Sequence, residues 1–403
     1  MKPRLIFYCQ PVLGMGHLVR SLAILQGLSD FEIWFVNGGL PISDDLQQLV
    51  PANIQVVELP PLQSDPDFQE LVPVANSPGT MVAPTVVADR QSIETIWERR
   101  RKILLELLER VASEILMIEL YPFGRLKFDA ELRPWLEAAR ERPRAPRIVC
   151  SLRDILVEKR DQTGFEEFAV TTANRFFDLI LIHSDPQFQR LDETFRPLDQ
   201  LTCRVEYTGY ITRPPCQSEG SSPGMEPGVV ASIGGGRVGV ELLWSTIRAS
   251  RLLQPAIPHH LTIFTGPYLP DTDLRELIAE CASDRQIEVK RFTPDLALEM
   301  SCASLSISLA GYNTCMDIII AGVPAIVLPF TGNNNLEQTR RARKLAAMGL
   351  VQIISPHELS AERLAELMKL SLSRPRTRLS PAIDLGGVEK TARILGAIAA
   401  GNW

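Results

Sequence analysis

The chain has 403 residues, a formal net charge of −6 and 22% charged residues. This length exceeds what one hydrophobic core usually holds, so we expect two domains of roughly 200 residues each. The acidic balance argues against a nucleic-acid binder, which must neutralise many phosphates. No stretch approaches the ~20 uncharged apolar residues of a membrane-spanning helix. The seven cysteines are scattered without a C-x-x-C pair, which disfavours a zinc site or disulfide framework and fits a cytoplasmic protein.

The first half alternates short apolar strands with amphipathic helices, a pattern typical of strand-helix-strand units and parallel sheets. Its long, proline-rich segment 60–88 has no clear period, and loops of that length are usually functional or mobile. The expected strands lie near 4–9, 31–36, 54–58, 115–120, 147–151 and 178–182. The expected helices lie near 17–29, 90–112, 129–141 and 165–176.

A segment rich in proline, serine and glycine then interrupts the pattern over 212–226, which predicts a linker. We therefore expect an N-terminal domain over 1–211 and a C-terminal domain over 227–403. The two similar halves indicate an α/β protein with two Rossmann-like parallel-sheet domains that face an interdomain cleft. The second half has expected strands near 228–233, 260–265, 286–290, 304–308, 324–328 and 350–354.

The segment Gly14-Met15-Gly16-His17 lies where the first strand turns into the first helix. Small residues at such a turn let a ligand approach the backbone, and the turn lies beyond the strand's carboxyl end, where open parallel sheets bind ligands. His17 has an unperturbed pKa of about 6.5, which suits a general base, although it could also only cap or pack its helix. Arg20, one helical turn on, could orient His17, meet an anionic ligand or be a surface charge.

Two further strand-to-helix turns lie in the second half. Gly234, Gly235 and Gly236 expose consecutive backbone N–H groups before a helix, which favours an anion site suited to a diphosphate, although a plain tight turn is the alternative. In the second turn Gly311 precedes a helix on which Asn313 and Asp317 share one face. Asp317 could accept hydrogen bonds from both ribose hydroxyls, or could only favour the helix dipole.

A third polar turn, 331–338, follows the apolar strand near 324–328. Its amides and carboxylate suit sugar hydroxyls, which need donors and acceptors alike. Runs of asparagine are also common in ordinary turns. The position beyond a strand's carboxyl end, beside the Gly311 turn, favours a ligand site.

With these segments in view, the chain resembles a GT-B glycosyltransferase whose carboxy-terminal half is similar to glycosyltransferase family 28. The resemblance rests on Gly14 to Arg20 and on Ser308 through Gln338, with Gly322-Val323-Pro324 between the turns. Three shorter segments also carry it: 149–154, 183–186 and 207–210. The resemblance therefore spans nearly the whole chain.

The resemblance implies that the second domain binds a nucleotide-sugar, a UDP-sugar in the first instance, and that the first domain presents the acceptor. It places the diphosphate at the glycines of both domains and at Asn313, the ribose at Asp317, and His17 as the base. Asp317 stands where the family has a glutamate and is one methylene shorter. The remaining implied contacts are uracil at Phe292 and Thr293, and donor-sugar hydroxyls at Glu337 and Gln338.

The implied reaction is direct displacement at the anomeric carbon, with inversion and without a metal or other cofactor, moving a hexose or N-acetylhexosamine to a hydroxyl acceptor. The acceptor could be a small molecule or lipid-linked. The basic run 99–102 and the loop 60–88 would then allow peripheral contact at the inner face of the membrane, although such a run is usually a solvated helix face.

Two alternatives stay open. The Gly-x-Gly-His-x-x-Arg pattern is also similar to UDP-sugar hydrolases of nonulosonic-acid synthesis, in which water replaces the acceptor. A sensor that binds nucleotide-sugars without turnover would keep the same two domains. The donor sugar, the acceptor and the oligomeric state do not follow from the sequence.

Overall fold

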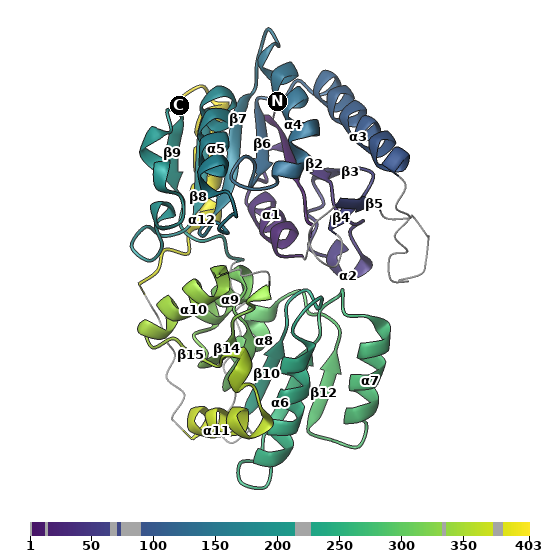
Figure 1. The fold of residues 1–403 in the computed structure, drawn as a ribbon, viewed down its shortest axis with the longest axis vertical. Helices are drawn as coiled ribbons and strands as arrows, with labels where there is room; N and C mark the ends of the chain where they lie inside the picture. The colour runs from purple at the N-terminus through teal and green to yellow at the C-terminus, as the bar shows by residue number, and fades with distance from the viewer. Residues whose placement is uncertain are drawn as a thin grey trace. The chain divides into compact units, whose positions relative to one another are not determined.

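The computed structural model describes residues 2–12, 15–64, 71–73, 90–213, 227–332, 336–373 and 382–403. The chain divides into two compact units. The first comprises Met1–Leu13, His17–Thr212 and Ile383–Trp403, and the second comprises Gly14–Gly16 and Arg213–Ala382. Each unit is built on its own parallel sheet (Figure 1).

The first unit contains a seven-stranded sheet in the order β3-β2-β1-β6-β7-β8-β9. All six neighbouring strand pairs are parallel, so every strand has its carboxyl end at the same edge. The strands are β1 (Arg4–Cys9), β2 (Glu32–Asn37), β3 (Ile54–Glu58), β6 (Ile115–Glu119), β7 (Arg147–Arg153), β8 (Leu179–His183) and β9 (Arg204–Tyr207).

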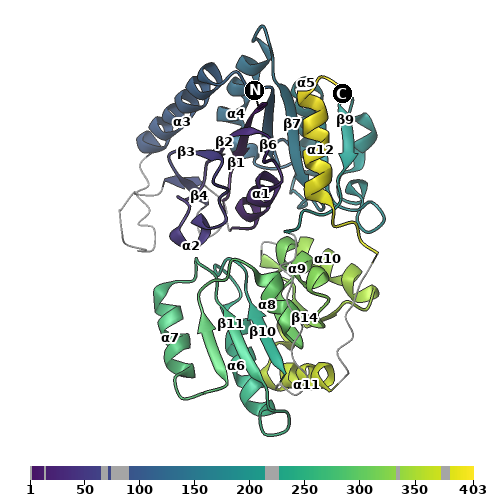
Figure 2. The ribbon, with the colours of Figure 1, turned by 180° about the vertical axis from the view of Figure 1, so that it is seen from behind.

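Helices cover both faces of this sheet, as the two opposite views show (Figures 1 and 2). One face carries α3 (Arg90–Arg110), α4 (Asp129–Arg140) and α5 (Gln162–Phe176). The other carries α1 (Gly16–Gln26) and α12 (Gly387–Ala399). A short helix, α2 (Asp44–Gln47), follows β2. Because both faces are covered, the central strands are apolar on both sides, and all five residues of β6 are buried.

The last helix belongs to the first unit, which corrects the expectation that the C-terminal domain extends to residue 403. The Tyr210 N–H donates to the Asp384 carbonyl at 2.8 Å, and the Gly387 N–H donates to the Tyr210 carbonyl at 3.1 Å. A Cβ on Gly387 would lie 2.5 Å from that carbonyl, so only glycine allows this approach. No pattern in the sequence indicated this return of the chain.

The second unit contains a six-stranded sheet, also parallel throughout, in the order β12-β11-β10-β13-β14-β15. Helix α6 packs against α11, and α8 packs against α9. The strands are β10 (Gly228–Ser232), β11 (His260–Phe264), β12 (Ile287–Lys290), β13 (Leu305–Leu309), β14 (Ala325–Leu328) and β15 (Val351–Ile353). The helices are α6 (Val240–Leu253), α7 (Asp271–Cys281), α8 (Leu296–Cys302), α9 (Tyr312–Ala321), α10 (Glu337–Ala347) and α11 (Ala361–Leu372).

The expected fold class is confirmed: the chain is an α/β protein with two parallel-sheet units. All twelve expected strands are present within a few residues of their expected positions. Strand β9 was missed because it is a short, polar edge strand, in which Arg204 is exposed and the other three residues are only half-buried. The segment 60–88 was expected to be one loop, yet β4 (Leu62–Ser64) and β5 (Leu71–Pro73) pair antiparallel within it, and the rest lies outside the described residues.

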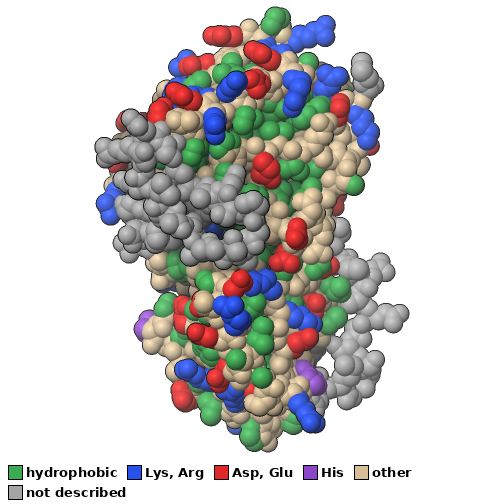
Figure 3. Space-filling view, turned by 90° about the vertical axis from the view of Figure 1, so that its right-hand side faces the viewer, with side chains coloured by type: hydrophobic (Ala, Val, Ile, Leu, Met, Phe, Trp, Pro, Cys, Tyr) green, Lys and Arg blue, Asp and Glu red, His purple; other side chains and the backbone are tan. Residues whose placement is uncertain are grey.

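Charges of both signs are interspersed on the face of the molecule shown in Figure 3. This agrees with the composition, in which 42 basic residues accompany 48 acidic ones. On this face, the described residues therefore form no broad patch of a single sign.

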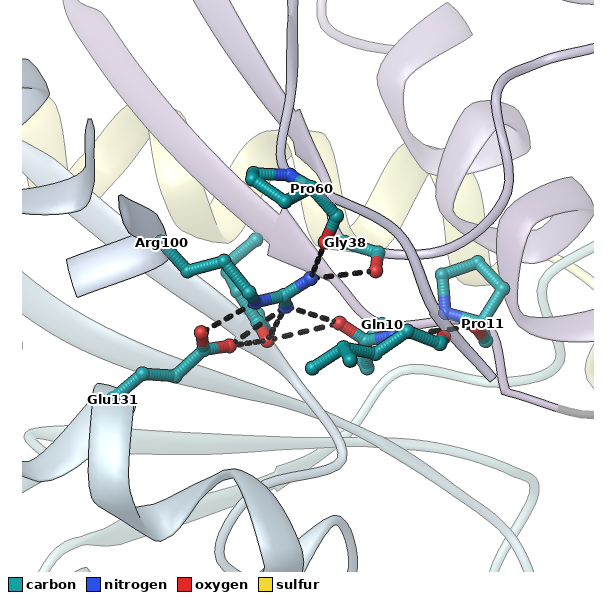
Figure 4. Close-up of polar contacts among 8 residues, drawn as sticks. Gln10, Pro11, Gly38, Pro60, Arg100 and Glu131 are labelled. Carbon is teal, nitrogen blue, oxygen red and sulfur yellow. Dashed lines mark hydrogen bonds and ion pairs between the residues drawn. The ribbon is translucent and has the colours of Figure 1, made fainter. Parts of the chain in front are cut away.

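A buried arginine holds together the carboxyl edge of the first sheet (Figure 4). Arg100, on α3, donates to the Glu131 carboxylate at 2.6 and 2.8 Å and to the Gln10 side-chain oxygen at 2.6 Å. It also donates to the carbonyls of Gly38 at 2.9 Å and Pro60 at 2.7 Å. Gln10 and Gly38 directly follow β1 and β2, and Pro60 lies two residues after β3, so one guanidinium fixes three neighbouring strand-end loops.

This network corrects the interpretation of 99–102 as a solvated basic face. Arg100 is fully buried and ion-paired, whereas Arg99 and Lys102 are exposed and Arg101 is half-buried. No local pattern distinguishes Arg100 from its neighbours, because its partner Glu131 lies 31 residues away on another helix.

We expect Arg100→Met to lower the free energy of unfolding by about 3–5 kcal/mol, because it leaves the Glu131 carboxylate buried and unpaired. Urea denaturation followed by circular dichroism measures the change. Arg99→Met is the matched control on the same helix and should change stability by no more than about 0.5 kcal/mol. Equal effects of the two substitutions would contradict this role of Arg100.

Candidate functional site

The candidate site in the first unit is built around His17, in the first turn of α1. Its Nδ1 lies 2.7 Å from Oε1 of Glu119, the last residue of β6. The His17 side chain is 18% exposed and that of Glu119 is fully buried. The arrangement is a histidine–carboxylate pair at the carboxyl end of a central strand, where parallel sheets bind ligands.

The environment keeps this imidazole neutral. Burial, together with the Arg125 and Arg20 charges, lowers the pKa of His17 to about 4, although Glu119 opposes the shift. Burial raises the pKa of Glu119, but His17, Arg20 and Arg125 outweigh it and lower that pKa to about 2. At neutral pH the Nδ1–H therefore donates to the carboxylate, and Nε2 carries the lone pair that can accept a proton.

Arg20 forms an ion pair with the same Oε1 of Glu119 and is only 3% exposed. Its Nη2 is 3.4 Å from His17 Nδ1. Arg20 is therefore not a surface charge, one of the alternatives left open by the sequence. It pairs with the carboxylate that binds His17, and its role in orienting the histidine stays a prediction. Glu119 itself was missed, although it ends an otherwise apolar strand, and a buried carboxylate there is a signal of function.

Of the two expected phosphate-binding glycines in this segment, Gly14 lies outside the described residues. Gly16 is the exposed first residue of α1. The described part of the turn therefore leads directly into the helix that carries His17.

In the second unit, the glycine turn follows β10. Gly234 and Gly236 have φ angles of +66° and +88°, a region that favours glycine. A Cβ on Gly236 would lie 2.6 Å from the Thr265 carbonyl oxygen, and Gly235 accepts a hydrogen bond from the Tyr268 N–H at 2.9 Å. The glycines are thus required by a compact turn between β10 and the loop after β11, and the same turn brings bare backbone to the carboxyl edge.

The Gly311 turn places the amino terminus of α9 at that edge. Gly311 is the N-cap residue and has no side chain to cap the helix. A Cβ on Gly311 would meet no atom closer than 4.0 Å, so the local fold does not require glycine there. Asn313 is half-buried in the first turn. The amino terminus of a helix with open space beside its N-cap suits an anion.

Asp317 lies one turn further along α9 and is half-buried. Burial and the Asp295 charge raise its pKa to about 7, while the Arg213 charge opposes the shift. Near neutral pH the carboxyl group is thus present in both protonation states, and its protonated form can donate as well as accept a hydrogen bond.

The expected uracil contacts, Phe292 and Thr293, follow β12 at the same edge of the sheet and are half-buried. The Thr293 hydroxyl accepts a hydrogen bond from the Asp295 N–H at 3.3 Å, just before α8. This contact fixes the turn that carries both residues.

The expected donor-sugar residues begin α10. Glu337 is 8% exposed and pairs with the fully buried Arg341 at 2.9 Å, and Gln338 accepts a hydrogen bond from the Phe330 N–H at 3.0 Å. Arg341 also donates to the Ala310 carbonyl at 3.2 Å, and its guanidinium lies 5.5 Å from the centre of the Tyr312 ring. Arg341, which the sequence analysis missed, therefore ties this turn to the start of α9.

Within the described residues, no group of three or more His, Cys, Asp or Glu side chains could hold a metal ion. The sequence contains two D-x-D triplets, a spacing that can bind metals, at 65–67 and 271–273. The first lies outside those residues, and in the second Asp271 forms an ion pair with Arg291 at the start of α7. No helix in the described part of the chain is long and apolar enough to cross a membrane.

Comparisons with known proteins fit this arrangement. Residues 230–388 match the model of the Glycosyltransferase family 28 C-terminal domain. A relative from Sinorhizobium medicae (strain WSM419) is 33% identical over 125 residues, which are 30% of this chain and 33% of that protein. It is the UDP-N-acetylglucosamine--N-acetylmuramyl-(pentapeptide) pyrophosphoryl-undecaprenol N-acetylglucosamine transferase. The aligned stretch thus spans about a third of the relative's length.

Two solved structures share the whole fold. MurG from Acinetobacter baumannii has a TM-score of 0.57 at 15% identity and covers 98% of this chain and 99% of its own. A UDP-glucosyltransferase from Polygonum tinctorium has a TM-score of 0.60 at 13% identity, with 99% of each chain covered. At such low identity the likeness shows the fold alone. That fold is the GT-B fold. Residues 230–388 resemble a glycosyltransferase family 28 C-terminal domain, and the chain as a whole resembles the GT-B glycosyltransferases.

The raised pKa of Asp317 predicts a pH-dependent effect of its substitution. Its value of about 7 lies above the ordinary value of 3.8, so the folded state holds this proton more tightly than the unfolded state does. Its contribution to stability is complete below about pH 4 and is lost as the pH rises through about 7.

The wild type should therefore lose stability as the pH rises from about 5 to about 8, whereas Asp317→Asn should not. Over this range we expect the difference in free energy of unfolding between the two proteins to change by roughly 2 kcal/mol in favour of Asp317→Asn. Denaturation curves of both proteins at the two pH values measure the gain. Glu276→Gln, an exposed change on α7, should give no such difference. An equal response of Asp317→Asn and Glu276→Gln to pH would contradict the assigned pKa.

Proposed function

We propose that this chain is a glycosyltransferase that moves a hexose or N-acetylhexosamine from a nucleotide-sugar, in the first instance a UDP-sugar, to a hydroxyl acceptor. The observation that carries the proposal is the neutral His17 held by the buried Glu119 carboxylate. The relative from Sinorhizobium medicae is named for transfer from UDP-N-acetylglucosamine to a pyrophosphoryl-undecaprenol acceptor, which supports a UDP-sugar donor and a lipid-linked acceptor.

In the first unit, His17 Nε2 removes the proton from the acceptor hydroxyl as its oxygen attacks the anomeric carbon. The positive charge that develops on the imidazole is stabilised by Glu119 through the Nδ1–H hydrogen bond of 2.7 Å. The bond from the anomeric carbon to the phosphate oxygen breaks at the same time, and attack from the opposite face inverts the anomeric configuration.

In the second unit, the departing UDP carries the negative charge. We assign its diphosphate to the Gly234–Gly236 turn, to the N–H groups that begin α9 and to Asn313, all at the carboxyl edge of the sheet. We assign the ribose to Asp317, the uracil edge to the backbone near Phe292 and Thr293, and the sugar hydroxyls to Glu337 and Gln338. This assignment requires no metal, since backbone N–H donors stabilise the negative charge of the departing diphosphate.

The ion pair with Arg341 refines the role of Glu337. The guanidinium holds Oε1 and so orients the Glu337 carboxylate at the start of α10, where we assign it to the sugar hydroxyls. Gln338 binds the Phe330 N–H through its side-chain oxygen, and we assign its amide N–H groups as donors to the same hydroxyls.

His17→Ala should lower turnover by at least about 100-fold and leave the affinity for UDP unchanged, because the base acts on the acceptor and not on the nucleotide. Glu119→Gln should lower turnover in the same direction, since it removes the charge that stabilises the imidazolium. The assay measures UDP release from UDP-sugars with and without a panel of hydroxyl acceptors, and calorimetry measures UDP binding. Unchanged turnover of His17→Ala would remove it as the base.

The same assay separates transfer from its alternatives. Stoichiometric sugar release without any acceptor would identify a hydrolase, and tight UDP-sugar binding without turnover on any acceptor would identify a sensor. A transferase gives acceptor-dependent UDP release, with the sugar recovered on the acceptor.

Gly311→Ala tests the donor site without disturbing the fold. Since the added methyl group meets open space, we expect unchanged thermal stability but an affinity for UDP reduced by about 10-fold or more, because the methyl group occupies the path of the phosphate. Gly396→Ala on α12, where a Cβ also meets no atom within 4 Å, is the matched control and should bind UDP normally. Normal UDP binding by Gly311→Ala would exclude the α9 terminus as the phosphate site.

A further inference from the structure

The turn after β6 has an unusual backbone. Leu120 and Arg125 have φ angles of +68° and +59°, the positive values found among the described non-glycine residues. Each such residue costs about 1–3 kcal/mol and persists where the surrounding structure imposes it. The turn is also tightly packed, since a Cβ on Gly124 would lie 2.8 Å from the Leu120 side chain. This backbone holds Arg125 in one place, at the end of the turn that begins after Glu119.

The Arg125 side chain has unmet hydrogen-bonding capacity. Within the described part of the chain it makes no hydrogen bond, and its Nε is buried without a partner. Burial and the Arg153 charge lower its pKa, while Glu119 lies near enough to oppose the shift. Glu119 is already bound by Arg20 and His17. A half-buried guanidinium with unmet donors is costly unless a bound ligand supplies acceptors.

Two further cations lie near Arg125. Strand β7 runs parallel to β6, with Ser151 opposite Glu119, so Arg153 ends the neighbouring strand at the same edge of the sheet. Lys159 lies in the loop that follows β7. The charges of Arg153 and Arg125 both add to the effect of burial in lowering the pKa of Lys159, as expected of cations that lie close together. We call Arg125, Arg153 and Lys159 the Arg125 cluster.

We propose that the Arg125 cluster binds a phosphate group of the acceptor. This inference rests on the proposed transfer reaction and names the class of its acceptor: a phosphorylated molecule, whether soluble or lipid-linked. A guanidinium presents two parallel N–H groups that match two phosphate oxygens, and several cations suit a group with about two negative charges better than a carboxylate. Because Arg125 follows Glu119, the phosphate would lie near the base.

The binding test uses inorganic pyrophosphate as the probe, with the donor site first saturated with UDP, and calorimetry as the measurement. We expect Arg125→Gln to weaken pyrophosphate binding by about 10-fold or more, because it removes a charge-assisted pair of hydrogen bonds. Arg125→Lys keeps the positive charge but lacks the two parallel N–H groups of the guanidinium, so it should weaken binding less. Arg99→Gln, an exposed change on α3, is the control and should bind like the wild type.

A second arm distinguishes the sources of the phosphate. Sedimentation with neutral vesicles, with and without an isoprenyl phosphate, measures whether Arg125 also recognises a lipid-linked phosphate. Dependence on Arg125 in either arm supports the proposal, and the arm in which it occurs identifies the source. Equal binding by Arg125→Gln and Arg99→Gln in both arms would overturn it. If Arg125→Gln does not fold, Lys159→Gln carries the same test with a smaller expected loss.

UDP affinity, measured in the same samples, separates this inference from the proposed function. Arg125→Gln should bind UDP like the wild type, because the donor site is assigned to the second unit. A wild-type chain that binds UDP but shows no Arg125-dependent binding in either arm would refute only the acceptor phosphate. A wild-type chain that does not bind UDP would refute the donor assignment.

Discussion

The buried carboxylate of Glu119 is the constraint on which the rest of the first unit's site depends. It ends the central strand β6, is fully buried, and its Oε1 binds both His17 and Arg20. A lone carboxylate there would be strongly disfavoured, so the strand end requires cations around it. Arg20 supplies one on α1, and Arg125 supplies a second charge from the turn after the strand. The position of His17 and the left-handed turn at Leu120 and Arg125 thus belong to one electrostatic arrangement.

In the proposed reaction, the same arrangement determines how His17 acts as the base. A histidine beside a carboxylate alone would have a raised pKa, yet burial and two arginine charges lower it to about 4. At neutral pH the imidazole is therefore almost wholly in the form that accepts a proton, and it does not need to lose one first. The lowered pKa has a cost, because it makes the imidazole a weak base. Proton transfer to it is favourable only as the acceptor oxygen forms its bond to carbon. Glu119 lowers that cost, because it stabilises the imidazolium as it forms.

The sequence predicted features that depend on local pattern and missed those that depend on contacts between distant segments. Apolar runs and their spacing placed the strands, and glycines at strand ends indicated the turns before α1, α6 and α9. His17 and Arg20 were found because they lie next to such glycines. Glu119 lies 102 residues from His17, and Glu131 lies 31 residues from Arg100, so no spacing rule links either pair. The return of α12 to the first unit likewise depends on a tertiary contact, at Tyr210 and Gly387.

The pKa values of two carboxyl groups are shifted in opposite directions, since that of Glu119 in the first unit is lowered and that of Asp317 in the second is raised. Each shift suits a different task. In the first, surrounding cations keep a carboxylate charged and a histidine neutral, which favours removal of a proton. In the second, burial and the Asp295 charge raise the pKa of Asp317 to about 7, so the carboxyl group is only partly ionised at neutral pH. A fully charged carboxylate close to a diphosphate would repel it, whereas a partly protonated one can still bond to ribose hydroxyls. The shorter aspartate in place of the family's glutamate is thus compatible with a nucleotide site, because its protonation, and not only its reach, sets what it can bind.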